Sequence, residues 1–187
     1  MPITTLDAKT ALVLIDLQKG IVARQTVHPI AGVVSNVVAL ANAFRRRGLP
    51  VVLINVAGGA PGRSETPRLP GQFPAEWTEL IPELKAQASD LHITKWTWGA
   101  FHDTPLDEQL KARGVTQIVL AGVSTSIGVE STARQAFERG YNVTLATDAM
   151  TDTVAECHEN SVTRIFPRLG ETGSTQDILA KLNELPA

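Results

Sequence analysis

Cysteine is almost absent from this sequence of 187 residues, in which Cys157 is the only example. One thiol cannot form an internal disulfide and cannot supply a multi-cysteine zinc site. Aromatic residues make up only 5% of the chain, so aliphatic side chains must build the core. A lone cysteine can still be a catalytic nucleophile, and this question directs attention to where Cys157 lies.

Strong charge of one sign and long apolar runs are also missing. The chain carries 17 Lys and Arg against 19 Asp and Glu, and this balance provides no electrostatic footprint for nucleic acid or an acidic membrane. No apolar run approaches the roughly 18 residues of a membrane span, and the N-terminal residues do not resemble a signal peptide. We therefore expect a cytoplasmic protein with a small-molecule substrate and no nucleic-acid or membrane partner.

Short apolar runs alternate with helical patterns along the chain. The length predicts a single domain over residues 1–187. Apolar runs typical of strands buried on both faces occupy residues 11–15, 50–56, 91–94, 117–121 and 142–146. Helical patterns occupy residues 30–47, 106–113, 127–139, 153–166 and 175–182. The alternation predicts a three-layer α/β/α fold, with a mostly parallel six-stranded Rossmann-like sheet and helices on both faces.

Two charged residues stand where predicted strands end. Asp16 ends the first strand and Lys95 follows the third. The carboxyl ends of parallel strands form the edge at which such sheets bind ligands. Burial there raises the pKa of a carboxyl group and suits it to proton transfer. If the third strand neighbours the first, Lys95 meets Asp16; the alternatives are a turn-capping Asp and a solvated Lys.

The turn after the fourth predicted strand leads into a helix. Free N–H groups at such a helix start can bind an anion or an oxyanion. Ser124 and Ser126 lie there, but the sequence lacks Gly-x-Ser-x-Gly, and helix capping is the simpler role for both. Cys157 lies in a later predicted helix beside His158, and adjacent helical residues point in different directions. We expect Cys157 to be a small buried core residue.

Two further segments are candidates for binding. Residues 57–71 are rich in Gly and Pro and include Arg63 and Arg68, whose planar guanidinium groups suit a carboxylate. Trp96, Trp98 and Phe101 follow Lys95 and either wall a pocket or pack a loop. The four histidines show no metal-ligand spacing, so we expect no metal and no cofactor.

The strand-end segments together resemble the isochorismatase-like hydrolase superfamily. The matching segments are Leu-Ile-Asp-Leu-Gln at 14–18, Thr-Lys-Trp at 94–96, Ala-Gly-Val-Ser-Thr-Ser-Ile-Gly-Val-Glu-Ser-Thr-Ala at 121–133 and Ala-Thr-Asp-Ala-Met at 146–150. The resemblance implies that Asp16 and Lys95 match two members of an Asp–Lys–Cys triad. The third position holds Gly128. The resemblance also implies a cis peptide at Val123–Ser124 and an oxyanion hole from the backbone of Ser124 and Gly128.

True isochorismatases, which cleave a vinyl ether, also carry Gly at the thiol position. By this resemblance Asp16 is a general acid that protonates the enol-pyruvyl methylene carbon, and water then adds to the oxocarbenium centre. Lys95 holds Asp16 and binds a substrate carboxylate. The resemblance also implies a homo-oligomer, either a dimer or a tetramer, and a set of substrate-binding residues: Gln18, Asn55, Arg63, Trp96, Trp98 and Phe101.

Residues 129–134, Val-Glu-Ser-Thr-Ala-Arg, are instead typical of the cysteine-hydrolase branch. Two alternatives therefore stay open beside vinyl-ether hydrolysis. One is an amide or imide hydrolase without a thiol, in which Asp16 activates water. The other is a non-catalytic member that only binds a small molecule. The metal cluster of the nicotinamidase branch is missing, because Asn55-Val56-Ala57 stands after the second strand.

Overall fold

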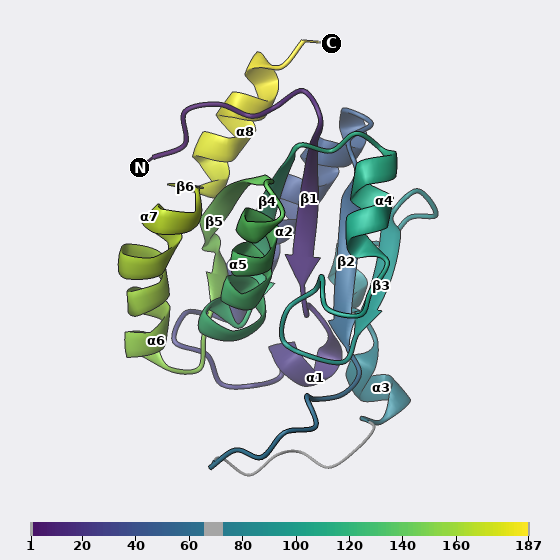
Figure 1. Cartoon of the computed structure of the whole chain (residues 1–187), viewed down its shortest axis with the longest axis vertical. Coiled ribbons are helices and arrows are strands. Elements are labelled where there is room, and N and C mark those ends of the chain that lie inside the picture. The colour runs from purple at the N-terminus through teal and green to yellow at the C-terminus, as the bar shows by residue number, and fades with distance from the viewer. Residues whose placement is uncertain (1, 66–72, 187) are drawn as a thin grey trace.

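A six-stranded sheet forms the centre of the computed structural model, which describes residues 2–65 and 73–186 (Figure 1). The spatial order is β3-β2-β1-β4-β5-β6, and all neighbouring strands are parallel. The strands are β1 (Thr10–Ile15), β2 (Val51–Val56), β3 (Leu91–Lys95), β4 (Gln117–Val123), β5 (Asn142–Thr151) and β6 (Glu171–Gly173). The predicted fold class is confirmed.

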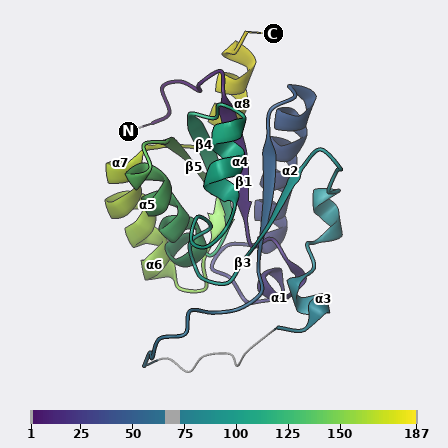
Figure 2. The ribbon, with the colours of Figure 1, turned by 45° about the vertical axis from the view of Figure 1, so that its right-hand side comes forward.

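Helices cover both faces of this sheet, as Figures 1 and 2 show from two directions. Along β1, Leu12 and Leu14 pack in a core with residues of α2 and α8, whereas Val13 and Ile15 pack in a second core with residues of α4, α5 and α7. This alternation follows from the two-residue period of a strand. The helices are α1 (Lys19–Val22), α2 (Ile30–Arg46), α3 (Ala75–Thr78), α4 (Leu106–Ala112), α5 (Glu130–Glu138), α6 (Ala155–Asn160), α7 (Phe166–Leu169) and α8 (Thr175–Glu184), with a 3₁₀ turn at Pro82–Leu84.

Two predicted helices are interrupted in the structure. The pattern over residues 127–139 begins instead as a π-helical turn, Thr125–Val129, before α5. The pattern over residues 153–166 divides into α6, a second π-helical turn at Ser161–Ile165, and α7. Proline lies in the first turn of α7, where its missing N–H is tolerated. Apolar spacing alone does not distinguish these turns from continuous α-helix.

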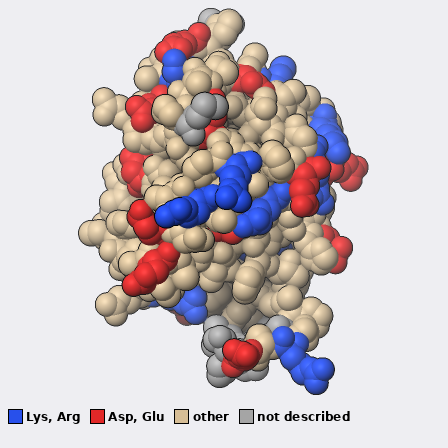
Figure 3. All heavy atoms as spheres, turned by 60° about the vertical axis from the view of Figure 1, so that its left-hand side comes forward, with Lys and Arg blue, Asp and Glu red and all other residues tan. Residues whose placement is uncertain are grey.

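The surface carries mixed charge. On the face drawn in Figure 3, a short row of Lys and Arg side chains is bordered by Asp and Glu. Arg134 and Glu130 of α5 lie four residues apart on one helix face and form an ion pair of 2.9 Å. Within the described residues, no helix is both long and apolar enough to cross a membrane.

Candidate functional site

Asp16 and Lys95 meet at the carboxyl edge of the sheet. Lys95 Nζ lies 2.8 Å from Asp16 Oδ2, and both side chains are buried, at 1% and 7% exposure. Their strands are not neighbours, because β2 lies between β1 and β3. The expected contact therefore forms, but the condition attached to it was wrong, because the long Lys95 side chain spans the width of β2 to reach Asp16.

Asp16 has an unusual backbone and an unusual environment. Its φ of 51° lies in the left-handed region, where Asp and Asn are the tolerated non-glycine residues. Its Oδ1 is buried and has no hydrogen-bond partner among the described residues. Burial raises the pKa of Asp16 to about 6, although the neighbouring Lys95 ammonium acts to lower it. A carboxyl group with this pKa exchanges a proton readily near neutral pH.

Lys95 is held from two sides. Its Nζ donates to Asp16 Oδ2 at 2.8 Å and to the carbonyl oxygen of Thr97 at 3.2 Å. An ammonium group has three N–H donors, and these two bonds use two of them. The hydroxyl oxygen of Thr97 is also buried without a hydrogen-bond partner among the described residues. Unpaired buried polar atoms are rare and call for an explanation such as a ligand or a catalytic role.

The turn after β4 brings Gly128 beside this pair. A Cβ atom on Gly128 would lie 3.1 Å from Asp16 Oδ2 and 3.6 Å from Lys95 Nζ. It would also lie only 2.8 Å from the Cγ2 methyl of buried Ile15. The position that the resemblance assigns to a thiol is therefore next to the Asp–Lys pair, and the Ile15 methyl group occupies part of the space that a side chain would need.

β4 approaches β1 closely just before this turn. Gly122 has a φ of 123°, and a Cβ there would lie 2.1 Å from the carbonyl oxygen of Ile15. The next peptide, Val123–Ser124, is cis, as the resemblance implied. The carbonyl oxygen of Ser124 accepts hydrogen bonds from the N–H groups of Ile127 and Val129, each at 3.2 Å. These features place the turn against the end of the strand that carries Asp16.

The expected capping roles of the two serines are not found. Ser124 occupies the cap position but its side chain makes no capping hydrogen bond. Ser126 donates instead, through its N–H at 2.7 Å and its hydroxyl at 2.9 Å, to Oδ2 of Asp152. Asp152 is 1% exposed and follows β5. It was missed because the predicted fifth strand ended at residue 146; with the strand extended to Thr151, Asp152 is a strand-end carboxylate like Asp16.

Two residues that were predicted to bind substrate make internal hydrogen bonds. Gln18 is fully buried; its side chain accepts from the N–H of Val56 at 2.7 Å and donates to the carbonyl oxygens of Val56 and Trp77. Asn55 donates to the carbonyl oxygen of Thr78 and accepts from the hydroxyl of Thr94. Both side chains thus connect β2 to its surroundings, and their binding of substrate stays a prediction.

The other predicted binding residues differ in position. Trp96 and Trp98 are 49% and 62% exposed on the loop that follows Lys95, and the Trp96 ring lies against Gly58. Arg63 is exposed on the segment after β2, whereas Arg68 lies outside the described residues. Phe101 is buried in the core formed with α4 and α5, and the Arg139 guanidinium lies over its ring.

Cys157 has no part in this arrangement. It lies on α6 and is exposed, so its predicted burial was wrong. Its neighbour His158 does contact the turn after β4: His158 Nδ1 lies 2.9 Å from the Thr125 hydroxyl, and its ring packs edge-on against His28. Within residues 2–65 and 73–186, no three His, Cys, Asp or Glu side chains are placed to hold a metal ion.

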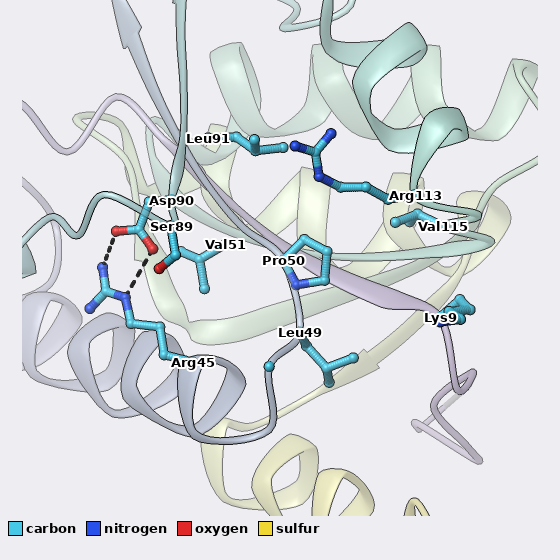
Figure 4. Close-up of a pocket in the computed structure, with 11 residues that line it drawn as sticks. Lys9, Arg45, Leu49, Pro50, Val51, Ser89, Asp90, Leu91, Arg113 and Val115 are labelled. Carbon is cyan, nitrogen blue, oxygen red and sulfur yellow. Dashed lines mark hydrogen bonds and ion pairs between the residues drawn. The ribbon is translucent and has the colours of Figure 1, made fainter.

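A separate charged cavity lies at the opposite, amino edge of the sheet (Figure 4). It has a volume of about 450 Å³ and is lined by residues at the starts of β2 and β3, among them Pro50 and Leu91. Arg45 lines it, but its guanidinium binds both carboxylate oxygens of Asp90, at 3.1 and 2.6 Å. The guanidinium group of Arg45 is therefore already paired. The residues that line this cavity include neither Asp16 nor Lys95.

The chain is thus an α/β protein whose parallel sheet carries a buried acid and a buried ammonium group at its carboxyl edge, where such sheets bind ligands. The chain belongs to the isochorismatase family, since the family model described as "Isochorismatase domain" matches residues 10–177. These proteins are hydrolases, and the expected family is confirmed.

Three similar proteins illustrate this relationship. The uncharacterized isochorismatase family protein YwoC of Bacillus subtilis is 43% identical over 181 residues, which cover 93% of this chain and 94% of YwoC. An isochorismatase family protein from Burkholderia thailandensis has a solved structure with a TM-score of 0.92 and 41% identity, covering 96% of this chain and 98% of that chain. Enterobactin synthase component B of Escherichia coli is 28% identical over 161 residues, which cover 79% of this chain and 53% of that protein.

Proposed function

We propose that this protein hydrolyses a vinyl ether of the isochorismate type without a covalent enzyme intermediate. The observation that carries the proposal is the buried Asp16 carboxyl group, in which one oxygen is paired to Lys95 and the other has no partner in the part of the chain that the structure describes. The presence of Gly128 beside this pair supports it, because glycine offers no nucleophile. The match to the family model described as "Isochorismatase domain" supports this class of substrate.

The first step is a proton transfer to carbon. Protonated Asp16 gives its proton to the methylene carbon of the enol-pyruvyl group, and the adjacent ether carbon becomes an oxocarbenium centre. Such a transfer requires a carboxyl group that is still partly protonated near neutral pH, and the pKa of Asp16, raised by burial to about 6, meets this requirement. The unpaired Oδ1 is the oxygen available to carry that proton.

The second step is the addition of water. Water attacks the oxocarbenium carbon and its proton returns to the Asp16 carboxylate. In the resulting hemiketal, the bond between the former oxocarbenium carbon and the ether oxygen breaks, and the proton of the hemiketal hydroxyl passes to that ether oxygen. The products are pyruvate and a dihydroxy-cyclohexadiene carboxylate. The ammonium group of Lys95 favours the Asp16 carboxylate between the two steps, and its third N–H is available to a substrate carboxylate. The backbone of the turn around Ser124 and Gly128 is the candidate partner for another substrate oxygen.

Pyruvate release from isochorismate tests this proposal. Asp16→Asn removes the acid and keeps a residue that tolerates the left-handed backbone, so the rate is expected to fall by a factor of roughly 10² or more. Asp103 provides a matched control: its φ is 50° and its side chain is 90% exposed. Asp103→Asn makes the same chemical change at the same kind of backbone position, and it is expected to leave the rate unchanged.

Two other outcomes would point elsewhere. If the wild-type protein releases no more pyruvate than Asp16→Asn, vinyl-ether hydrolysis is wrong. Hydrolysis of an amide or imide that Asp16→Asn abolishes would then favour water activation by Asp16. Binding of isochorismate without turnover would favour a non-catalytic family member. It stays a prediction that the protein binds no metal and forms a homo-oligomer.

A further inference from the structure

Two side chains of α5 hold the backbone of the loop that follows Lys95. The hydroxyl oxygen of Thr132 accepts a hydrogen bond from the N–H of Ala100 at 3.1 Å. Oε1 of Gln135 accepts from the next N–H, that of Phe101, at 3.0 Å. Residues three apart lie on one face of a helix, so α5 binds two consecutive peptide groups of this loop. Gly99 lies directly against Gln135, where a Cβ would come within 2.3 Å of its Oε1.

Thr132 makes a second hydrogen bond that Gln135 does not. Its hydroxyl donates to the carbonyl oxygen of Gly128 at 2.7 Å, and Thr132 is fully buried. Bonding of a threonine to the carbonyl four residues earlier is common in helices, but accepting from Ala100 at the same time is not explained by helix formation. One hydroxyl group therefore joins the turn of Gly128 to the loop after Lys95.

Both joined segments contact the Asp16–Lys95 pair. The loop contributes the carbonyl oxygen of Thr97, which accepts from Lys95 Nζ at 3.2 Å. The turn places the Cα of Gly128 so that a Cβ would lie 3.1 Å from Asp16 Oδ2. A hydroxyl that fixes one segment against the other also fixes the ammonium group against the turn.

We infer that Thr132 is a positioning residue of the site. It holds the turn that contains Gly128 (Thr125–Val129) and the loop that follows Lys95 (residues 96–105) in the relative position that sets the proton affinity of Asp16. Threonine suits this role because one hydroxyl donates and accepts at the same time. Valine has nearly the same shape and can do neither. The inference rests on the proposed function only in taking Asp16 as the group whose proton matters.

Titration of the Asp16 carboxyl carbon by ¹³C NMR tests this in the protein without substrate. Asp16→Asn assigns the resonance. In Thr132→Val the loop loses one anchor and Lys95 is held less firmly near Asp16, so the midpoint rises by about half a unit or more, a roughly threefold change in proton affinity. Thr132→Ser keeps the hydroxyl and is expected to restore the wild-type midpoint. Gln135→Met, which releases only the loop's second peptide, is expected to move it less.

The inference is overturned if Thr132→Val is folded and its midpoint equals or falls below that of the wild type. A midpoint that Thr132→Ser fails to restore overturns it too, because packing rather than the hydroxyl would then be responsible. If Thr132→Val does not fold, Thr132→Ala carries the same test. A wild-type protein that releases no pyruvate contradicts the proposed function but leaves this titration fully informative, so the two failures are distinguishable.

Discussion

The direction of the pH dependence separates an acid at Asp16 from a base at the same position. The proposed reaction uses protonated Asp16, whose pKa is raised to about 6 by burial. Between pH 5 and pH 7, the protonated fraction of such a group falls from about nine tenths to about one tenth. Since kcat/KM follows the protonation state of the free enzyme, kcat/KM for pyruvate release is expected to fall about tenfold over this range.

The measurement is an end-point determination of pyruvate at several pH values in buffers of constant ionic strength, with Asp103→Asn in parallel. Lys95→Met sharpens it, because the Lys95 ammonium lowers the pKa of Asp16. Its removal should raise the pKa of Asp16 and so shift the fall of kcat/KM to higher pH. A value of kcat/KM that rises through this range would refute the general-acid role and favour water activation. If kcat/KM falls at the same pH in Lys95→Met as in the wild type, the titrating group is not Asp16.

The remaining predictions concern the residues around the pair. Gln18→Ala leaves the buried N–H of Val56 without its partner and should lower the free energy of unfolding by about 1–3 kcal/mol in urea denaturation; an unchanged midpoint would contradict the structural role. Gly128→Ala forces a methyl group against Ile15 and should cost about 1–3 kcal/mol, whereas a neutral change would show that Ile15 moves aside freely. Burial raises the pKa of Asp16 above its ordinary value of 3.8, so protonation of Asp16 stabilises the folded state, and this stabilisation is complete below about pH 4. This contribution to the free energy of unfolding, about 3 kcal/mol, should be lost as the pH rises through 6. Urea denaturation at several pH values checks this, with Asp16→Asn as the protein that lacks the titrating group. An equal dependence of the unfolding free energy on pH in both proteins would argue against the raised pKa.

The strands with strong apolar runs were predictable, and the strand order was not. β1, β2, β4 and the first half of β5 stand out because parallel strands are buried on both faces. β6 comprises only Glu171–Gly173 and has no apolar run to reveal it. Nothing local in the sequence says that β2 lies between β1 and β3, because that order depends on packing between distant segments.

The pair of Asp16 and Lys95 was predictable from the sequence, whereas the roles of the neighbouring polar residues were not. Charged residues after apolar strands are conspicuous, and such strands end at one edge of the sheet. Gln18 and Asn55 belong to the same segments, but their amide groups can bind a ligand or the backbone equally well. Only the positions of the Val56 and Thr78 peptides decide between these uses.

Gly122 makes the site vulnerable at a residue that takes no part in its chemistry. At this point the two strands that carry Asp16 and the Gly128 turn touch backbone to backbone, and a Cβ would lie 2.1 Å from the carbonyl oxygen of Ile15. Any other amino acid must push these strands apart. Every single-base change that replaces this glycine is therefore expected to produce a protein with all its reacting groups intact in sequence but misaligned in space, a form of inactivation that an inventory of catalytic residues would overlook.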